Sequence, residues 1–277
     1  MTEQGWFADT DVRDPEAAGH VVREGRADAP DDWPARAVEA GAAADEDEYY
    51  ELLREATVAG TRAAVQERER ADDQQLVHAV RAMADLSDAA NEVAERAVEW
   101  AGSLFEDVDA GVDGARAVAG RDPETLAEER AVSLCQRAAD LGDERERVRE
   151  FVEAQAPAVA PNLSMLAGPV LAARLIALAG SLDDLAKMPS GTVQVLGAED
   201  ALFAHLRGHA PSPKHGVIYT HEYVHGTHPG ERGSAARALA GKLSIAARVD
   251  HYSGDRRPEL RDELDERMER IRARDTE

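Results

Sequence analysis

The sequence predicts a mainly α-helical protein built around a long antiparallel coiled-coil hairpin. Apolar and small residues recur at alternating spacings of four and three along two segments, 76–104 and 127–152. That spacing is the repeat of a coiled coil. The segment between them, 105–120, contains three glycines and breaks the pattern. Downstream, residues 161–257 hold apolar stretches bounded by helix start and stop residues, which favours further helices.

Residues 1–45 are the part of the chain that sequence patterns describe least. Trp6, Phe7 and Trp33 are apolar anchors, and Pro30 and Pro34 interrupt the chain. A small α/β module and a partly disordered arm both fit this composition. We favour a small, incomplete module.

A helix is predicted from Asp45 to about Arg70. Acidic residues crowd its first turn and basic residues its last turn, an arrangement that suits the helix dipole. We expect Tyr50, Leu53 and Val58 to form its apolar side.

The hairpin follows, from residue 71 to 158. The seam of its first helix is rich in alanine, which permits the close approach of a second helix. The second helix is predicted to begin at Asp122-Pro123-Glu124, a helix start signature. Self-association through this arm is the functional interpretation, and two ordinary amphipathic helices packed on a globule are the alternative. Cys135 lies beside the seam and is interpreted as a small buried apolar residue.

The segment 156–161, Ala-Pro-Ala-Val-Ala-Pro, is predicted to be a hinge. An apolar, buried helix is expected over 166–179, with Gly180 as its C-cap. Ser181 opens a short helix that Pro189 ends. The link 190–196 is predicted to be extended, and a further helix runs from the Gly-Ala-Glu-Asp turn at 197–200 to about residue 207.

A basic, glycine-containing loop at 214–216 leads into a short β-like apolar segment that ends at Tyr219. A helix then spans about 231–250, with Arg237, Ser244 and Arg248 predicted on the face opposite its leucines. The chain ends in a mixed-charge helix, 256–277, whose apolar stripe contains the following residues: Leu260, Leu264 and Ile271.

Charge separates residues 161–257 from the rest of the chain. They carry ten basic and eight acidic side chains, whereas the remaining residues carry 22 basic and 47 acidic ones. A local excess of positive charge in a protein of formal charge −23 suggests contact with an anionic partner. Only three of the 32 basic residues are lysines. We interpret the dispersed acidity as adaptation to a salt-rich cytosol. A nucleic-acid-binding protein in such a cytosol would depend on shape, stacking and protein contacts, because phosphate attraction fades as salt rises.

Several function classes are not supported. One cysteine allows neither an intrachain disulfide nor a cysteine-based zinc site. No signal peptide or membrane span is recognisable, so a cytoplasmic protein is expected. His205 and His209 have a spacing that zinc can use, but no partner ligands accompany them. The sequence lacks a P-loop, a Gly-x-Ser-x-Gly motif and a nucleophile–base pair. We therefore predict a non-catalytic protein without metal or cofactor.

Two features point to an anion. The turn at 197–200 exposes backbone N–H groups that can hold a phosphate, although Glu199 and Asp200 also fit plain helix capping. The helix at 231–250 presents arginines beside glycines, a face that can approach a phosphate backbone closely. A solvated face is the alternative.

Three stretches carry a family resemblance. They are PNLSMLAGPVLAARLIALAGSLDDLAKMPSGTVQVLGAEDALFAHLRG, PKHGVIYTHEYV and RALAGKLSIAARVDHYSGD, within 161–255. They resemble the Nop domain of the archaeal box C/D small ribonucleoprotein scaffold, the eukaryotic nucleolar core proteins and a spliceosomal pre-mRNA processing factor. DDQQLVHAVRAMADLSDAANEVAERAVEWAGSLF and DEYYELLREA are similar to the preceding part of the family. Length and the lack of a basic tail favour the archaeal type.

The resemblance implies a scaffold for guide-RNA-directed ribose 2′-O-methylation, as in rRNA and tRNA processing. Such a scaffold binds a kink-turn RNA together with a kink-turn protein, self-associates through its coiled coil, and recruits fibrillarin, an S-adenosylmethionine-dependent methyltransferase. It also implies an all-helical Nop domain at 159–255, after a short segment, 1–70, that is a possible remnant of the fibrillarin-binding domain. Family contacts map here to Gly197, Ala198, Glu199, Phe203, Lys214, His215 and Gly216. To these our reading of the charged helix adds Arg237, Lys242 and Arg248.

The chain departs from the family pattern at three places. Asp200 stands where the turn usually has lysine, and Ala204 where the helix usually has arginine, so two phosphate contacts are missing. The segment before the coiled coil is also shorter than usual, and the C-terminal helix replaces the basic tail of some relatives. A coiled-coil adaptor that no longer binds RNA is therefore the alternative function.

Overall fold

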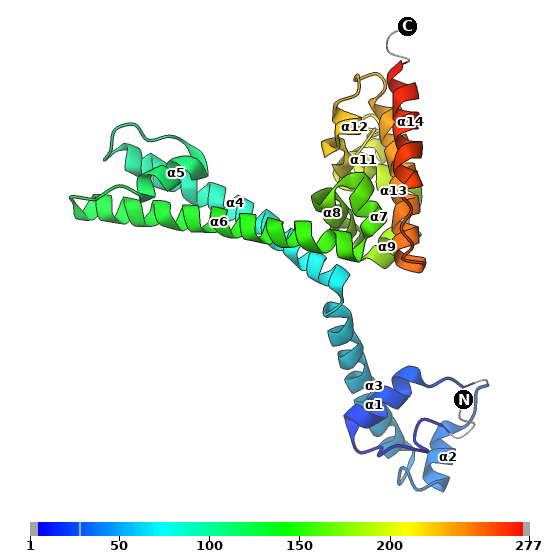
Figure 1. The fold of residues 1–277 in the computed structure, drawn as a ribbon. Coiled ribbons are helices and arrows are strands. Elements are labelled where there is room, and N and C mark those ends of the chain that lie inside the picture. The colour runs from blue at the N-terminus through cyan, green and yellow to red at the C-terminus, as the bar shows by residue number, and fades with distance from the viewer. Residues whose placement is uncertain (1–4, 28, 274–277) are drawn as a thin grey trace. The chain divides into compact units, whose positions relative to one another are not determined.

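The computed structural model describes residues 5–27 and 29–273, and among these residues it contains helices and no strand. The chain forms two compact units, Met1–Ala71 and Asp72–Glu277. Figure 1 shows the helices of both. The mainly α fold class predicted from the sequence is confirmed.

In the described residues of the first unit, three helices pack around an aromatic cluster. The helices are α1 (Pro15–Glu24), α2 (Trp33–Glu39) and α3 (Glu46–Glu69). Each begins after an aspartate whose carboxylate accepts backbone N–H bonds: Asp14, Asp32 and Asp45. Phe7 and Tyr49 are buried together with Ala37. The expectation of a β component is wrong for the described part of this unit.

Glycine determines which face of α3 is buried. A Cβ on Gly60 would lie 2.5 Å from the carbonyl oxygen of Gly19 on α1. The two backbones are therefore in direct contact, and Tyr49 and Ala56 are buried beside this crossing. The predicted apolar side of α3 is wrong at Tyr50 and Val58, which are exposed, because the close approach of α1 selects the face that carries the glycine.

The second unit begins with the hairpin. Helices α4 (Asp72–Gly102) and α6 (Leu126–Val159) lie side by side, and α5 (Gly111–Ala119) packs on both within the connecting segment (Figure 1). The contact between α4 and α6 buries small residues from both helices, which are Ala90, Ala94, Ala97, Ala101, Ala131, Cys135 and Ala138. The alanine seam and the buried Cys135 are confirmed.

Both ends of α6 differ from the prediction. The helix begins after Thr125, which forms a capping box with Glu128, and not at residues 122–124. At its other end the predicted hinge is helical, since α6 continues through Pro157 to Val159. The last turn closes with a hydrogen bond from Ala160 N to Ala156 O. Val152 and Ala156 are fully buried in the core of the unit, and that burial favours a continuous helix over a flexible joint.

The Nop-like region is a bundle of short helices around one long helix, α13 (Arg232–Tyr252). Leu239 and Leu243 of α13 are buried in the core. The remaining elements are α7 (Pro161–Ala167), α8 (Pro169–Ala179), α9 (Leu182–Lys187), α10 (Ser190–Val195), α11 (Glu199–Leu206), the 3₁₀ helix η1 (Val217–Thr220), α12 (Glu222–His225) and α14 (Glu259–Ala273).

Three predictions for this region are corrected. The apolar helix expected over 166–179 is broken at Gly168, whose φ of 78° ends α7 before α8 begins. The link 190–196, expected to be extended, contains α10, and the β-like segment is η1. Pro189 is the N-cap residue of α10, and Val193 of this helix is buried in the core. The Gly180 C-cap and the Ser181 N-cap are confirmed.

The ends of the bundle are joined by a buried polar network. The Asp250 carboxylate accepts bonds from the backbone N–H groups of Asn162 and Leu163 and from the Asn162 side chain. Asn162 is itself 2% exposed and also bonds Asp255 and Arg257 in the segment before α14. Burial raises the pKa of the Asp250 carboxyl, whereas the donated hydrogen bonds act in the opposite direction.

The hairpin and the bundle share a core. Leu76 and Val77 near the start of α4 are buried in the same cluster as the leucines of α13. Gln74 donates to the carbonyl of Gly180, and Asp73 accepts from the N–H of Leu182.

In the described part of the chain no single helix is long and apolar enough to span a membrane, while α7 and α8, bent by 116°, meet that criterion only as a pair.

Candidate RNA-binding surface

The Gly-Ala-Glu turn lies at the start of α11. Gly197 has a φ of 81°, in the region that favours glycine. The Glu199 carboxylate accepts a hydrogen bond of 2.7 Å from the Gly197 N–H. This contact occupies one of the N–H groups that we predicted for a phosphate. Further along α11, Phe203 is 56% exposed, so its ring is available to a partner.

The basic loop at 214–216 docks directly on the chain before this turn. Gly216 N donates to Gln194 O at 2.9 Å, and Val217 N donates to Leu196 O at 2.8 Å. The Gln194 side chain donates to the carbonyl of Lys214 at 2.7 Å. A Cβ on Gly216 would lie 2.0 Å from the Leu196 oxygen. Because only glycine permits this contact, the structure joins two motifs that the sequence separates by 14 or more residues.

Tyr219 organises a cluster of rings next to the loop. The His215 ring stacks on it with centroids 4.6 Å apart, and the Arg232 guanidinium lies 5.5 Å from its centroid. Arg232 also donates to the carbonyls of Thr227 and His225, which fixes its position. Burial, followed by the nearby charges of Arg232 and Lys214, lowers the pKa of His215. The stacked His215 and Tyr219 rings lie beside the basic loop, and aromatic rings of this kind can stack on nucleobases.

Tyr219 and Arg232 were not among the residues predicted from the sequence to contact RNA. The signal for both is present in hindsight: an aromatic residue follows the basic loop directly, and an arginine begins the long helix. Their contact depends on the path of the chain through η1 and α12, which pattern analysis did not describe correctly.

The three cations of α13 that were predicted to contact RNA lie in three different environments. Arg237 is exposed and makes no ion pair or hydrogen bond with the described residues. Lys242 pairs with Glu263 of α14. Arg248 donates to the carbonyls of Ala186 and Met188, so its guanidinium closes the C-terminal end of α9. An RNA contact by Arg248 remains a prediction and would have to compete with these bonds.

One predicted face of α13 is wrong. Ser244, expected beside the arginines on the open side, is 1% exposed and donates to the carbonyl of Ala240. Because the Ser244 hydroxyl has a hydrogen-bond acceptor within its own helix, the residue can be buried without an unpaired polar group. The open side of α13 is instead a groove shared with α14, with a volume of about 420 Å³. The groove is lined by Ser234, Arg237, Ala238, Gly241, Lys242, Ile245 and Arg267.

Three cations on this surface have no ion-pair partner among the described residues: Lys214, Arg237 and Arg267. The Lys214 side chain approaches Gly233 at the start of α13. Such cations can donate hydrogen bonds to phosphates. Among residues 5–27 and 29–273, no group of three or more His, Cys, Asp or Glu side chains could hold a metal ion. His205, which together with His209 has a spacing that zinc can use, has its ring hydrogen-bonded to the carbonyl of Ala210.

Comparison with known proteins gives a consistent result. The family model described as "Nop: snoRNA binding domain, fibrillarin" matches residues 68–271. A NOP5 family protein of Methanocaldococcus jannaschii is 50% identical over 132 residues, covering 48% of this chain and 32% of that protein. Nucleolar protein 56 of Saccharomyces cerevisiae is 41% identical over 142 residues, covering 51% and 28%. Human nucleolar protein 58 is 40% identical over 122 residues, covering 44% and 23%.

The matched region spans about a third or less of the length of these relatives. Among solved structures, the crystal structure of a fibrillarin/Nop5p complex contains a chain that superposes with a TM-score of 0.54 at 26% identity, covering 93% of this chain and 92% of that one. The family model covers most of the second unit, including α13 and both motifs of the candidate surface. The chain is a member of the Nop domain family.

Proposed function

We propose that this chain is a non-catalytic scaffold of a box C/D guide-RNA ribonucleoprotein. In this proposal the surface formed by the 197–199 turn, the 214–216 loop and α13 binds a kink-turn RNA together with a kink-turn protein. The observation that carries the proposal is the union of the two family motifs at one exposed site, next to the unpaired cations Lys214 and Arg237. The relatives that the chain matches are NOP5 family and nucleolar proteins.

Two further functions belong to the same proposal. The hairpin of α4 and α6 mediates self-association, and fibrillarin is recruited for ribose 2′-O-methylation of RNA. The chain that resembles this one in the fibrillarin/Nop5p complex supports the second function. The protein itself supplies no methyl transfer in this proposal, since its candidate surface offers cations, rings and backbone donors but no nucleophile–base pair.

A protein-interaction adaptor that no longer binds RNA is the second candidate. Asp200 is exposed in the first turn of α11, where it repels a phosphate, and Ala204 offers no charge. The engagement of Glu199 with Gly197 also occupies one backbone donor. These features favour loss of RNA binding at the turn, although they leave the loop and α13 unchanged.

A gel-shift experiment separates the two candidates. A box C/D kink-turn RNA is incubated in molar KCl with this protein, with the kink-turn protein, and with both. The scaffold proposal expects a supershift only when both are present. No supershift at any salt concentration would favour the adaptor.

Charge variants locate the contact. Lys214→Ala and Arg237→Ala should each weaken the supershift and reduce the salt dependence of binding by about one unit of slope, because each removes about one phosphate contact. Arg62→Ala is the matched control, since this exposed arginine belongs to the first unit. Equal effects of all three variants would contradict the proposed site.

A further inference from the structure

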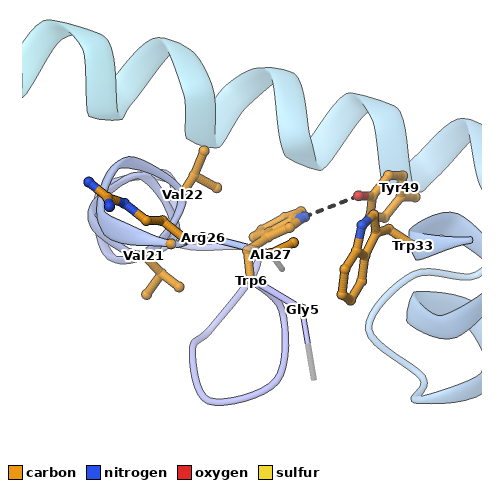
Figure 2. Close-up of a pocket in the computed structure, with 9 residues that line it drawn as sticks. Gly5, Trp6, Val21, Val22, Arg26, Ala27, Trp33 and Tyr49 are labelled. Carbon is orange, nitrogen blue, oxygen red and sulfur yellow. Dashed lines mark hydrogen bonds between the residues drawn. The ribbon is translucent and has the colours of Figure 1, made fainter. Parts of the chain in front are cut away.

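The first unit contains a small cavity with aromatic walls. Its volume is about 180 Å³, below the range of about 300–1,000 Å³ typical of pockets for drug-sized ligands. The space therefore suits a single side chain. It is lined by Gly5, Trp6, Val21, Val22, Gly25, Arg26, Ala27, Trp33 and Tyr49, most of which appear in Figure 2.

Three aromatic residues line this cavity, and two of them, Trp6 and Tyr49, hold each other in place. The Trp6 indole N–H donates to the Tyr49 hydroxyl at 3.3 Å (Figure 2), and the centroids of the two rings are 6.0 Å apart. Tyr49 is 5% exposed and anchors the wall in the core of the unit. Trp33 begins α2 and already has the Arg36 guanidinium 5.2 Å from its ring. Fixed indole and phenol faces attract cations through their ring quadrupoles.

The backbone around the cavity also favours positive charge. Val21, Val22 and the C-cap residue Gly25 belong to the C-terminal end of α1, and the C-terminus is the negative end of a helix dipole. The surrounding unit carries 18 acidic and eight basic residues between positions 1 and 71, so its field attracts cations over a longer range.

Among the described residues that line the cavity, Arg26 alone is charged. In Figure 2 its guanidinium extends away from Trp6 and Trp33, and the residue is exposed. Arg26 therefore leaves the space between the rings open. Its positive charge nevertheless repels a cation that enters the cavity. This gives the site a residue through which cation binding can be adjusted without altering its walls.

We propose that this cavity binds the cationic side chain of a lysine or arginine in a basic segment of a partner protein. The alkyl part of such a side chain packs on Val22 and Ala27, and its charge lies against the aromatic faces. This inference goes beyond the proposed RNA scaffold function and requires neither RNA nor the second unit.

The test uses the full-length protein and short peptides. The indole N–H signals of Trp6, Trp33 and Trp100 are followed by NMR during titration with acetyl-Gly-Lys-Gly-amide, its arginine counterpart, and its norleucine and glutamate counterparts. The lysine and arginine peptides should shift the Trp6 and Trp33 signals saturably and leave Trp100, which lies in the second unit, unchanged. The norleucine peptide should bind about two- to fivefold more weakly, the ratio that cation–π energies of about 0.5–1 kcal/mol give.

Two variants sharpen the result without disturbing the walls. Arg26→Glu should bind the lysine peptide several-fold more tightly, whereas Arg62→Glu changes the charge of the same unit equally but away from the cavity and should change the affinity much less. Equal tightening in both variants would attribute the effect to the general field and would overturn the assignment of the cavity. Norleucine binding as tight as lysine binding, or no saturable shift with either cationic peptide, would overturn it as well.

Discussion

Gly216 shows how one residue can join two motifs into a surface. Its backbone passes so close to Leu196 that a Cβ would overlap the carbonyl oxygen at 2.0 Å. Hydrogen bonds from Gly216 N and Val217 N also join these two segments of the chain. The loop that carries Lys214 and His215 is therefore held in position by backbone contacts and not by its own side chains.

Gly216→Ala should consequently destabilise the second unit. The clash is with backbone atoms, which cannot rotate away, and forced overpacking typically costs about 1–3 kcal/mol. Urea unfolding followed by circular dichroism measures the change. Gly191→Ala in α10 is the control, because a Cβ there meets no atom within 4 Å; it should be neutral or slightly stabilising. A stability equal to that of the wild type in Gly216→Ala would show that the two segments are not in contact.

His221 gives the unit a pH dependence. Its Nδ1 accepts from the Tyr223 N–H, and its Nε2 lies 3.0 Å from the carbonyl of Leu166. This pair of contacts requires the neutral ring with its proton on Nε2. Burial lowers the pKa of His221; Arg261 and His225 lower it further, and Glu222 and the Leu166 carbonyl raise it.

We therefore expect the unfolding free energy to decrease as the pH falls below about 6.5, the pKa of histidine in an unfolded chain. Above that pH the ring is neutral in both the folded and the unfolded state, and the stabilisation by His221 is fully present. Below that pH the unfolded chain takes up a proton before the folded one does, so stability is lost as the pH falls towards the folded-state pKa. His221→Gln should reduce this slope. An identical slope in His221→Gln would exclude His221 as its source.

At the scale of elements, the hairpin depends on the small size of its seam residues. Ala97 is fully buried between α4 and α6, and close packing of two helices leaves no space for a larger side chain. Ala97→Leu should therefore destabilise the protein by about 1–3 kcal/mol. Ala84→Leu, on the exposed side of the same helix, should be close to neutral. Thermal melts compare the two, and equal melting temperatures would mean that the seam is not tightly packed.

Element types with strong local signals were predictable from the sequence. The seam of the hairpin, the C-cap at Gly180 and the N-cap at Ser181 each depend on residues within a turn or two. Pro157 and the 190–196 segment were not predicted correctly, because burial of Val152 and Ala156 and packing against α13 decide their conformation. Local patterns do not contain that tertiary information.

The candidate surface was predictable only in part for the same reason. The motifs at 197–199 and 214–216 could be selected by family resemblance, whereas the hydrogen bonds that tie the second motif to Gln194 and Leu196, just before the first, are visible only in the structure. The environments of the cations could not be selected in this way. Whether an arginine faces solvent, as Arg237 does, or closes a neighbouring helix, as Arg248 does, depends on the packing of α9 against α13.

At the scale of the whole molecule, negative charge dominates. The formal charge is −23, and the ion pairs that offset it are largely exposed, such as Arg147–Glu144 and Arg149–Glu153. Exposed pairs contribute little to stability, and salt screens them. The net effect of charge on the folded state is therefore self-repulsion, which acts over the full length of the chain.

This balance predicts that the protein becomes more stable as KCl rises towards molar concentrations. Screening shortens the Debye length from about 10 Å at 0.1 M to about 3 Å at 1 M salt, and it removes repulsion between carboxylates faster than it removes attraction within close pairs. Urea unfolding midpoints across a KCl series measure the effect. Glu150→Gln and Asp88→Asn, which neutralise exposed carboxylates on α6 and α4, should raise the midpoint at low salt and lose that advantage at high salt. A stability maximum at low salt would contradict this account of the acidic composition, and it would require the carboxylates to be held by specific attractive contacts.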